Sequence, residues 1–137
     1  MKILLDTNII MDALQERQPF DAAAKEILLR SQNGGIKIYF TANAAADIFY
    51  LYSKARDLQS ARSALEYLLN NFGVVSVTHE DCLNALSIPI DDFEDALVVA
   101  CAQKINADYI VSRDEEFLQS KSQVAVISPG GLLDKLN

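Results

Sequence analysis

The stretch Ile3-Leu4-Leu5-Asp6-Thr7-Asn8, close to the start of the chain, decides the fold class. Three large apolar residues followed at once by polar ones predict a short strand that is buried on both faces and ends at a carboxylate. Strands buried on both faces are typical of parallel sheets with helices on each side. The stretch therefore predicts an α/β protein, and it makes the residues that follow each strand the ones to inspect.

The same pattern recurs along the chain. Four further apolar runs, rich in β-branched residues or bounded by Gly, Asn or Pro, are predicted as strands over 36–40, 74–77, 109–111 and 124–127. Helical patterns fall at about 19–32, 43–56, 59–71, 80–87 and 93–105, with a short turn near 115–119 and a last helix from Pro129. This alternation predicts a three-layer α/β/α sandwich around a parallel sheet of four to five strands. No repeat or linker is visible, so we expect residues 1–137 to form a single domain.

The composition suits such a domain but sets a constraint on its partners. The 137 residues are 50% hydrophobic and 23% charged, and 19 acidic residues against 12 basic ones give a net charge of −7. That charge alone would repel a nucleic acid, so nucleic-acid binding would need a bridging cation, a local basic patch or a basic partner. We see no secretory signal and no membrane-spanning apolar run, and therefore expect a soluble cytoplasmic protein. Two cysteines and one histidine supply neither a disulfide framework nor a zinc site.

Carboxylates directly follow two of the predicted strands. Asp6 ends the first, and either Asp6 or Asn8 can cap the helix that we expect to begin at Ile9. Because Asn8 suffices as that cap, Asp6 has no required structural role, and we expect it to be a functional residue. Asp114 follows the fourth strand, where capping of a short helix is the competing interpretation. The loop after the first strand contains no glycine, which excludes a phosphate-binding turn of the Rossmann or P-loop kind.

Two helices contribute further acids. Asp47 falls about one turn into the helix after the second strand, and its small or apolar neighbours predict a mostly buried position. Four acids open the helix over 93–105, which is more than a helix dipole needs: Asp91, Asp92, Glu94 and Asp95. Of these, Asp95 shares a helical face with Val98 and Val99, so we expect it to point toward the sheet.

Together these residues place several like charges at one edge of the sheet. Like charges at short range raise one another's pKa and destabilise the fold unless a cation neutralises them. Oxygen ligands without His or Cys favour hard ions such as Mg²⁺ or Mn²⁺, which also bind phosphates. One or two such ions would therefore let an acidic protein receive a nucleic acid.

The arrangement resembles the PIN domain family of metal-dependent ribonucleases, which includes the VapC toxins of bacterial toxin–antitoxin pairs. The likeness spans essentially the whole chain and rests on Asp6-Thr7-Asn8, Asp47-Ile48-Phe49-Tyr50, Asp92-Phe93-Glu94-Asp95-Ala96 and Ser112-Arg113-Asp114-Glu115-Glu116-Phe117. Two positions depart from the family pattern: Asp47 stands where Glu is common, and Glu116 stands where a second Asp is common. The resemblance implies a strand order of 3-2-1-4-5, with Asp6 and Asp114 on adjacent strands.

The resemblance also implies an activity. It predicts hydrolysis of RNA phosphodiester bonds with one or two Mg²⁺ or Mn²⁺ ions held by Asp6, Asp47, Asp95 and Asp114. Residues expected to support these four are Thr7, Asn8, Asp92, Glu94, Ser112 and Glu116, and candidate phosphate contacts are Lys54, Arg56, Arg62 and Arg113. The expected partners are RNA, a small antitoxin and a second copy of the chain. The alternative is a PIN-like module that binds RNA or a protein without cutting.

Overall fold

A five-stranded parallel sheet forms the centre of the computed structural model, which describes residues 1–137. Its strands are β1 (Lys2–Leu5), β2 (Lys37–Thr41), β3 (Gly73–Val75), β4 (Tyr109–Val111) and β5 (Val126–Ile127). They lie in the order β3-β2-β1-β4-β5, as the resemblance implied. The central strand β1 pairs Ile3 with Ile38 of β2, and Leu4 with Ile110 of β4. The carboxyl ends of β1 and β4 therefore lie side by side, where the strand order reverses.

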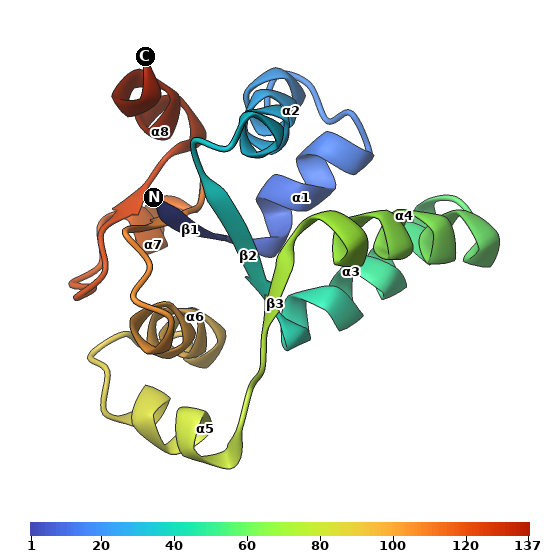
Figure 1. The fold of residues 1–137 in the computed structure, drawn as a ribbon. Coiled ribbons are helices and arrows are strands. Elements are labelled where there is room, and N and C mark those ends of the chain that lie inside the picture. The colour runs from blue at the N-terminus through green and yellow to red at the C-terminus, as the bar shows by residue number, and fades with distance from the viewer.

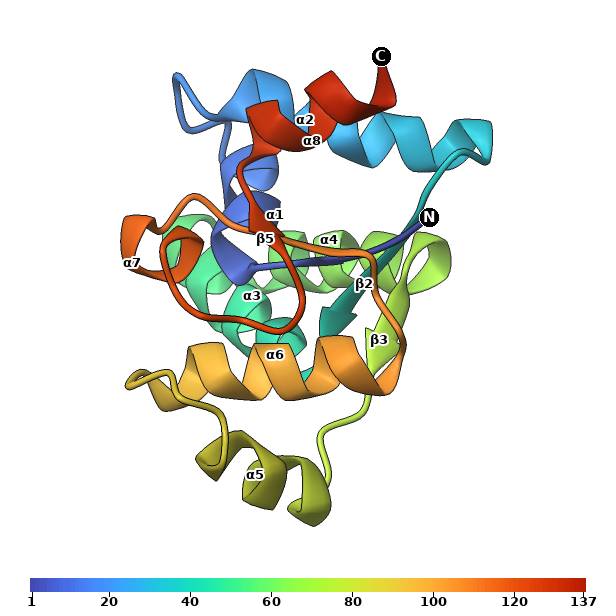
Figure 2. The same ribbon diagram turned by 90° about the vertical axis from the view of Figure 1, so that its left-hand side faces the viewer.

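Helices cover both faces of the sheet, which confirms the three-layer prediction (Figures 1 and 2). On one face lie α1 (Thr7–Leu14), α2 (Asp21–Arg30), α3 (Ala42–Ala55), α4 (Leu58–Asn71) and α8 (Pro129–Leu136). The other face carries α6 (Phe93–Lys104), with α5 (His79–Leu86) packed outside it, and two short helices, η1 (Ser31–Asn33) and α7 (Glu115–Leu118), complete the chain. No helix is both long and apolar enough to cross a membrane.

The alternation of side chains along β1 divides the core into two parts. Ile3 and Leu5 are buried in a cluster with residues of α1, α2, α3 and α8, whereas Leu4 is buried against residues of α6 and α7. Because successive strand residues point to opposite faces, a strand covered on both sides must be apolar at every position. This is the physical reason for the run Ile3-Leu4-Leu5.

Several predicted boundaries were wrong. The strand expected over 74–77 ends at Val75, because Val77 is apolar for a different reason: it packs against the cluster between α5 and α6. The strand expected over 124–127 pairs only over Val126–Ile127. The helix expected over 19–32 is divided into α2 and the 3₁₀ turn η1, after which Gly34 adopts a left-handed conformation.

Candidate active site

One cavity, of about 320 Å³, lies at the sheet edge where β1 and β4 end. Six carboxylates from four parts of the chain line it: Asp6, Asp47, Asp92, Glu94, Asp95 and Asp114. The remaining lining residues are Thr7, Asn8, Tyr50 and Leu51, so the cavity wall carries no Lys, Arg or His. The topology thus brings together the four acids expected at the centre of the site and four of the six residues expected to support them.

Asp6 is the most constrained of these acids. One carboxylate oxygen, Oδ1, accepts a hydrogen bond from the Thr7 backbone N–H at 2.9 Å, and Oδ2 accepts one from the Ser112 hydroxyl at 2.9 Å. Burial raises the pKa of Asp6 despite these two bonds, and the negative charges of Asp114 and Asp92 raise it further. The charged form of Asp6 is therefore disfavoured in the protein without a cation.

The Asp6 contacts correct one prediction. The helix expected to begin at Ile9 begins at Thr7, and Asp6 is its N-cap, while Asn8 lies inside the first turn and is exposed. Capping by Asp6 is compatible with a second role, since a cap needs one carboxylate oxygen to face the helix N-terminus. The second oxygen is the one that Ser112 orients.

Asp92 and Asp95 lie at the start of α6, with Asp92 as the N-cap. Its Oδ1 accepts a hydrogen bond from the Asp95 backbone N–H at 3.1 Å. Asp95 is half-buried, and burial is the largest cause that raises its pKa to about 7, followed by the charges of Asp92, Asp6, Asp114 and Glu94. A carboxyl group with a pKa this high sits in strongly negative, poorly hydrated surroundings, which is frequent at functional sites.

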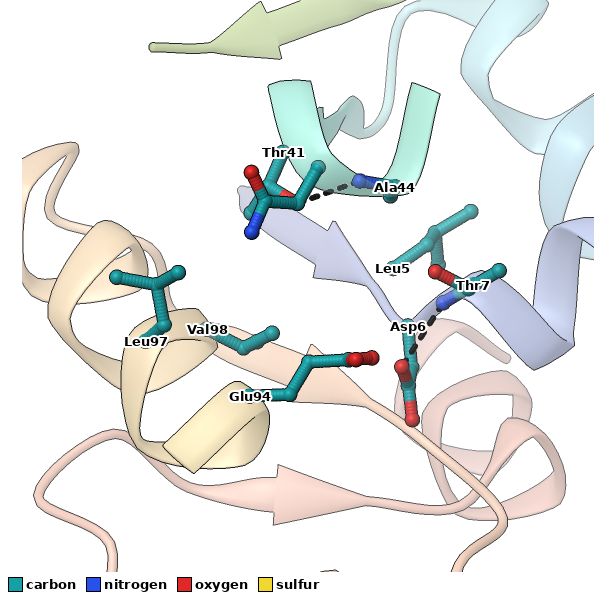
Figure 3. A pocket seen from close by; sticks show the side chains of 9 residues that line it. Leu5, Asp6, Thr7, Thr41, Ala44, Glu94, Leu97 and Val98 are labelled. Atoms are coloured by element: carbon teal, nitrogen blue, oxygen red, sulfur yellow. Dashed lines mark hydrogen bonds between the residues drawn. The ribbon is translucent and has the colours of Figure 1, made fainter. Parts of the chain in front are cut away.

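Glu94 faces Asp6 across a small hollow that adjoins the cavity. Figure 3 shows the Glu94 side chain extending from α6 toward the carboxylate of Asp6 at the end of β1. Burial raises the pKa of Glu94, and the charges of Asp47, Asp6 and Asp92 add to the effect. The influence of Asp47 on Glu94 places the α3 acid within electrostatic range of the α6 acids.

Asp47 itself is exposed, which corrects the prediction of a mostly buried position. The helix α3 buries Ala44 and Ile48, and Asp47 lies on the side that borders the cavity. Of the small residues before it, Ala44 is buried in the core cluster and Ala45 packs against the same cluster, whereas Ala46 is exposed like Asp47.

Asp114 is the N-cap of α7. Its Oδ1 accepts a hydrogen bond from the Glu116 backbone N–H at 3.1 Å, and its own backbone N–H donates to the Ser112 hydroxyl at 3.1 Å. The fully buried Ser112 hydroxyl thus donates to the Asp6 carboxylate and accepts from the Asp114 backbone, which connects the two residues. Glu116 lies apart from this cavity and lines a neighbouring one with Asp92 and Asp95.

None of the four basic residues expected to contact phosphate lines the cavity itself. Lys54 lies in the last turn of α3 with its ammonium group 5.6 Å from the centre of the Tyr50 ring, which borders the cavity. Arg56 and Arg62 are exposed and do not line the cavity. The guanidinium group of Arg113, also expected to contact phosphate, instead forms two hydrogen bonds with Asp12, at 2.7 and 3.1 Å, and Arg113 does not line the cavity.

The donor set fits a hard dication, although the side chains do not already form a closed cage. No three of the His, Cys, Asp and Glu side chains are grouped closely enough to hold one ion as they stand. Asp92 and Asp114 each direct one oxygen into a helix cap and leave the other without a hydrogen bond. Mg²⁺ commonly uses only one or two carboxylates and keeps several waters, so a cage of protein ligands is not required.

Comparisons with known proteins agree with this geometry. The family profile described as a PIN domain matches residues 2–116 of the chain. The chain is a member of the PIN domain family. Among curated proteins, none matches it.

Solved structures with the same fold as this PIN domain come from several bacteria. VapBC2 from Rickettsia felis, bound to a DNA fragment from its promoter, is 17% identical with a TM-score of 0.70, over 93% of this chain and 97% of that one. VapC20 from Mycobacterium tuberculosis, described as a toxin that cleaves the sarcin–ricin loop, is 18% identical with a TM-score of 0.71, over 88% and 95%. DNA-bound VapBC from Salmonella typhimurium is 12% identical with a TM-score of 0.72, over 94% and 98%.

Two features of the site were missed in the sequence. Leu51 lines the cavity beside Tyr50 and the acids, and its position on α3 four residues after Asp47 was a usable signal. Asp12 forms a buried ion pair with Arg113. The signal for Asp12 was an acid inside the otherwise apolar run from Ile9 to Ala13.

Proposed function

We propose that this PIN domain is a metal-dependent endoribonuclease and the toxin of a type II toxin–antitoxin pair. The observation that carries the proposal is the gathering of six carboxylates around one cavity with no basic side chain in its wall. Such a concentration of negative charge destabilises a protein unless it serves to bind a cation. The toxin assignment is supported by the fold shared with the VapC and VapBC structures.

Asp6, Asp95 and Asp114 are the proposed carboxylates for the ion, with Asp47 reaching it through water. A bound Mg²⁺ or Mn²⁺ would supply a more acidic water and neutralise charge on the phosphate oxygens. The chain's own part is to orient these carboxylates: Ser112 donates to Asp6, Asp92 accepts from the backbone N–H of Asp95, and Asp114 is held as the N-cap of α7. Because the pKa of Asp95 is raised to about 7, an ion that binds there at neutral pH would displace protons from part of the molecules.

An antitoxin with a basic side chain would suit the same cavity. An Arg that enters a pocket of carboxylates forms charge-assisted, frequently bidentate hydrogen bonds and so competes with the ion and the RNA. The similar structures include toxin–antitoxin complexes, one of them from Klebsiella pneumoniae. We propose that an antitoxin neutralises this PIN domain by placing such a basic side chain in the cavity, and that toxin and antitoxin meet in the cytoplasm.

The test is cleavage of a defined single-stranded RNA by the purified chain. We expect cleavage with Mg²⁺ or Mn²⁺, complete loss of cleavage with EDTA, and recovery when excess ion is added. RNA binding without cleavage under every ion condition would contradict the proposal and favour a binding module instead. Cleavage that persists in EDTA would contradict the role of the carboxylates.

Lys54 is the proposed phosphate contact, because its ammonium group lies over the Tyr50 ring at the rim of the cavity. We expect Lys54→Ala to raise the KM for RNA several-fold with kcat nearly unchanged, and to lower the slope of log affinity against log salt by about 1. Measurement of KM and kcat at several salt concentrations checks this.

The matched control for Lys54 is Lys135→Ala. Lys135 also lies in the last turn of a helix, with its ammonium group 5.6 Å from the centre of a tyrosine ring, that of Tyr109. Tyr109 begins β4, so this pair lies at the edge of the sheet opposite the cavity. An equal increase in KM in both variants would show that general charge, and not a contact at Lys54, attracts the RNA.

A further inference from the structure

An ion pair between a buried carboxylate and a partly exposed arginine connects α1 to the loop after β4. Asp12 of α1 has a side chain only 1% exposed, and both of its oxygens accept hydrogen bonds from Arg113, to Oδ2 from Nε at 2.7 Å and to Oδ1 from Nη2 at 3.1 Å. The guanidinium carbon of Arg113 lies 4.0 Å from the centre of the Phe20 ring. Arg17 approaches the same carboxylate less closely, with its Nη1 3.7 Å from Oδ1 of Asp12. Because a buried carboxylate needs a cationic partner and Arg113 makes the two shorter contacts, Arg113 is the main partner of Asp12.

Arg113 stands between two residues of the candidate active site. Ser112 on one side donates to Asp6, and Asp114 on the other side lines the cavity and donates its backbone N–H to Ser112. Neither Asp12 nor Arg113 lines the cavity. Two side-chain contacts therefore hold the loop after β4: Arg113 binds Asp12, and Ser112 binds Asp6.

Both ends of α1 participate in this arrangement. Asp6 caps the N-terminus of the helix, and Asp12 lies near its C-terminal end. The contact from Arg113 to Asp12 therefore fixes the loop to the same helix whose N-cap is the Asp6 carboxylate. The helix α1 therefore connects the Asp6 carboxylate to the loop that carries Asp114, in addition to the pairing of β1 with β4.

We infer that the Asp12–Arg113 ion pair positions the Asp114 carboxylate and the Ser112 hydroxyl in the cavity. Both members are positioning residues, since they act through Ser112 and Asp114. The planar guanidinium group matches a carboxylate with two parallel bonds, which a lysine cannot reproduce. The consequence for metal affinity rests on the proposed function, whereas the positioning of the loop does not.

The experiment compares Arg113→Lys, Asp12→Asn and the double variant Asp12→Asn/Arg113→Gln with the wild-type chain. Arg113→Lys keeps the charge that Asp12 needs, and so keeps the test usable if Asp12→Asn fails to fold. The first readout is amide hydrogen exchange at Asp114 and Glu116 in the metal-free protein. The second is Mn²⁺ affinity by calorimetric titration.

Asp81→Asn is the matched control. Asp81 is also a buried carboxylate, with a side chain 6% exposed, and it forms an ion pair with Lys104. It belongs to the capping box of α5 and does not line the acidic cavity. Like Asp12→Asn, this substitution removes the charge of a buried carboxylate that forms an ion pair and so lowers stability. It does not alter the loop after β4.

In Arg113→Lys and Asp12→Asn we expect exchange at Asp114 to be roughly 10-fold faster and Mn²⁺ affinity to be about 10- to 100-fold weaker. Asp81→Asn should leave both at wild-type values. The double variant should lose no more affinity than either single variant, because the two residues act as one unit.

Unchanged exchange at Asp114 in Arg113→Lys and Asp12→Asn would overturn the inference, and so would equal acceleration in Asp81→Asn. Faster exchange at Asp114 in a chain whose wild type binds no Mn²⁺ would support the positioning role while contradicting the proposed nuclease. Failure of the positioning role and failure of the proposed nuclease function therefore give different results.

Discussion

Asp6→Asn is expected to slow RNA cleavage by at least about 100-fold while the protein stays folded. Substitution of residues that only orient a metal ligand costs about 10- to 100-fold, so the loss of a ligand itself should reach or exceed the upper end. The amide keeps the cap of α1, since Asn is as good an N-cap as Asp and its carbonyl can accept from Thr7. The charge is removed and the local structure is kept.

Stability should move in the opposite direction from activity. Because burial raises the pKa of Asp6, the ionised carboxylate is less favourable in the folded metal-free protein than in the unfolded chain. A neutral amide avoids that cost, so the Tm of metal-free Asp6→Asn should equal or exceed that of the wild-type chain. Kinetics with a defined RNA, together with thermal unfolding, measure both effects.

Asp57→Asn is the control for Asp6. Asp57 is likewise an N-cap aspartate, whose Oδ1 accepts from the Ser60 backbone N–H at 2.7 Å at the start of α4, and it lies outside the cavity. Its substitution should leave kcat unchanged. Full activity in Asp6→Asn, or an equal loss in Asp57→Asn, would contradict the role given to Asp6.

Mn²⁺ is expected to raise the Tm of the wild-type chain by roughly 10 °C at neutral pH. A ligand at 100 times its Kd stabilises the folded state by about 2.7 kcal/mol, and each kcal/mol corresponds to several degrees for a domain of this size. Asp95→Asn should lose most of this increase, while Asp57→Asn should keep it. Thermal unfolding with and without Mn²⁺ measures the change.

Without Mn²⁺, the stability of the protein should fall as the pH rises toward neutral. Asp95 has a pKa of about 7 in the folded chain, against 3.8 as its ordinary value. A raised pKa means that the folded state binds the proton more tightly, so the stabilisation is fully present below about pH 4 and is lost as pH rises to about 7. This contribution should be absent from Asp95→Asn, and Mn²⁺ should stabilise little at pH 5, where Asp95 holds its proton.

Two results would contradict this account of stability. One is a Tm that does not respond to Mn²⁺ at any pH. The other is a metal-free Tm that rises between pH 5 and pH 8 in the wild-type chain and equally in Asp95→Asn. Either result would mean that the six carboxylates are tolerated without a cation.

The fold was predictable because the central strands leave little alternative. A run such as Ile3-Leu4-Leu5 must be buried on both faces, and this alone requires helices on each side of the sheet. The end of β3 was not predictable in the same way, because Val77 is apolar through packing against α5 and α6. Apolar character indicates burial, and only the structure shows against which element.

The acidic residues of the site were predictable for a topological reason. Asp6 and Asp114 follow adjacent parallel strands, so the sheet itself brings them together. The sequence could not decide which of Asp6 and Asn8 caps α1, since both are good caps and lie two residues apart. It also could not pair Asp12 with Arg113: an acid inside an apolar run indicates that Asp12 needs a partner, but nothing identifies Arg113, 101 residues away, as that partner.

The most direct measurement of the central claim is the anomalous scattering of Mn²⁺ in crystals of the wild-type chain. The account predicts a peak inside the cavity, about 2.2 Å from carboxylate oxygens, by the distances usual for hard dications. Those oxygens should belong to at least two of Asp6, Asp95 and Asp114. A cavity without a peak at saturating Mn²⁺, or peaks only at acids outside it, would contradict the account.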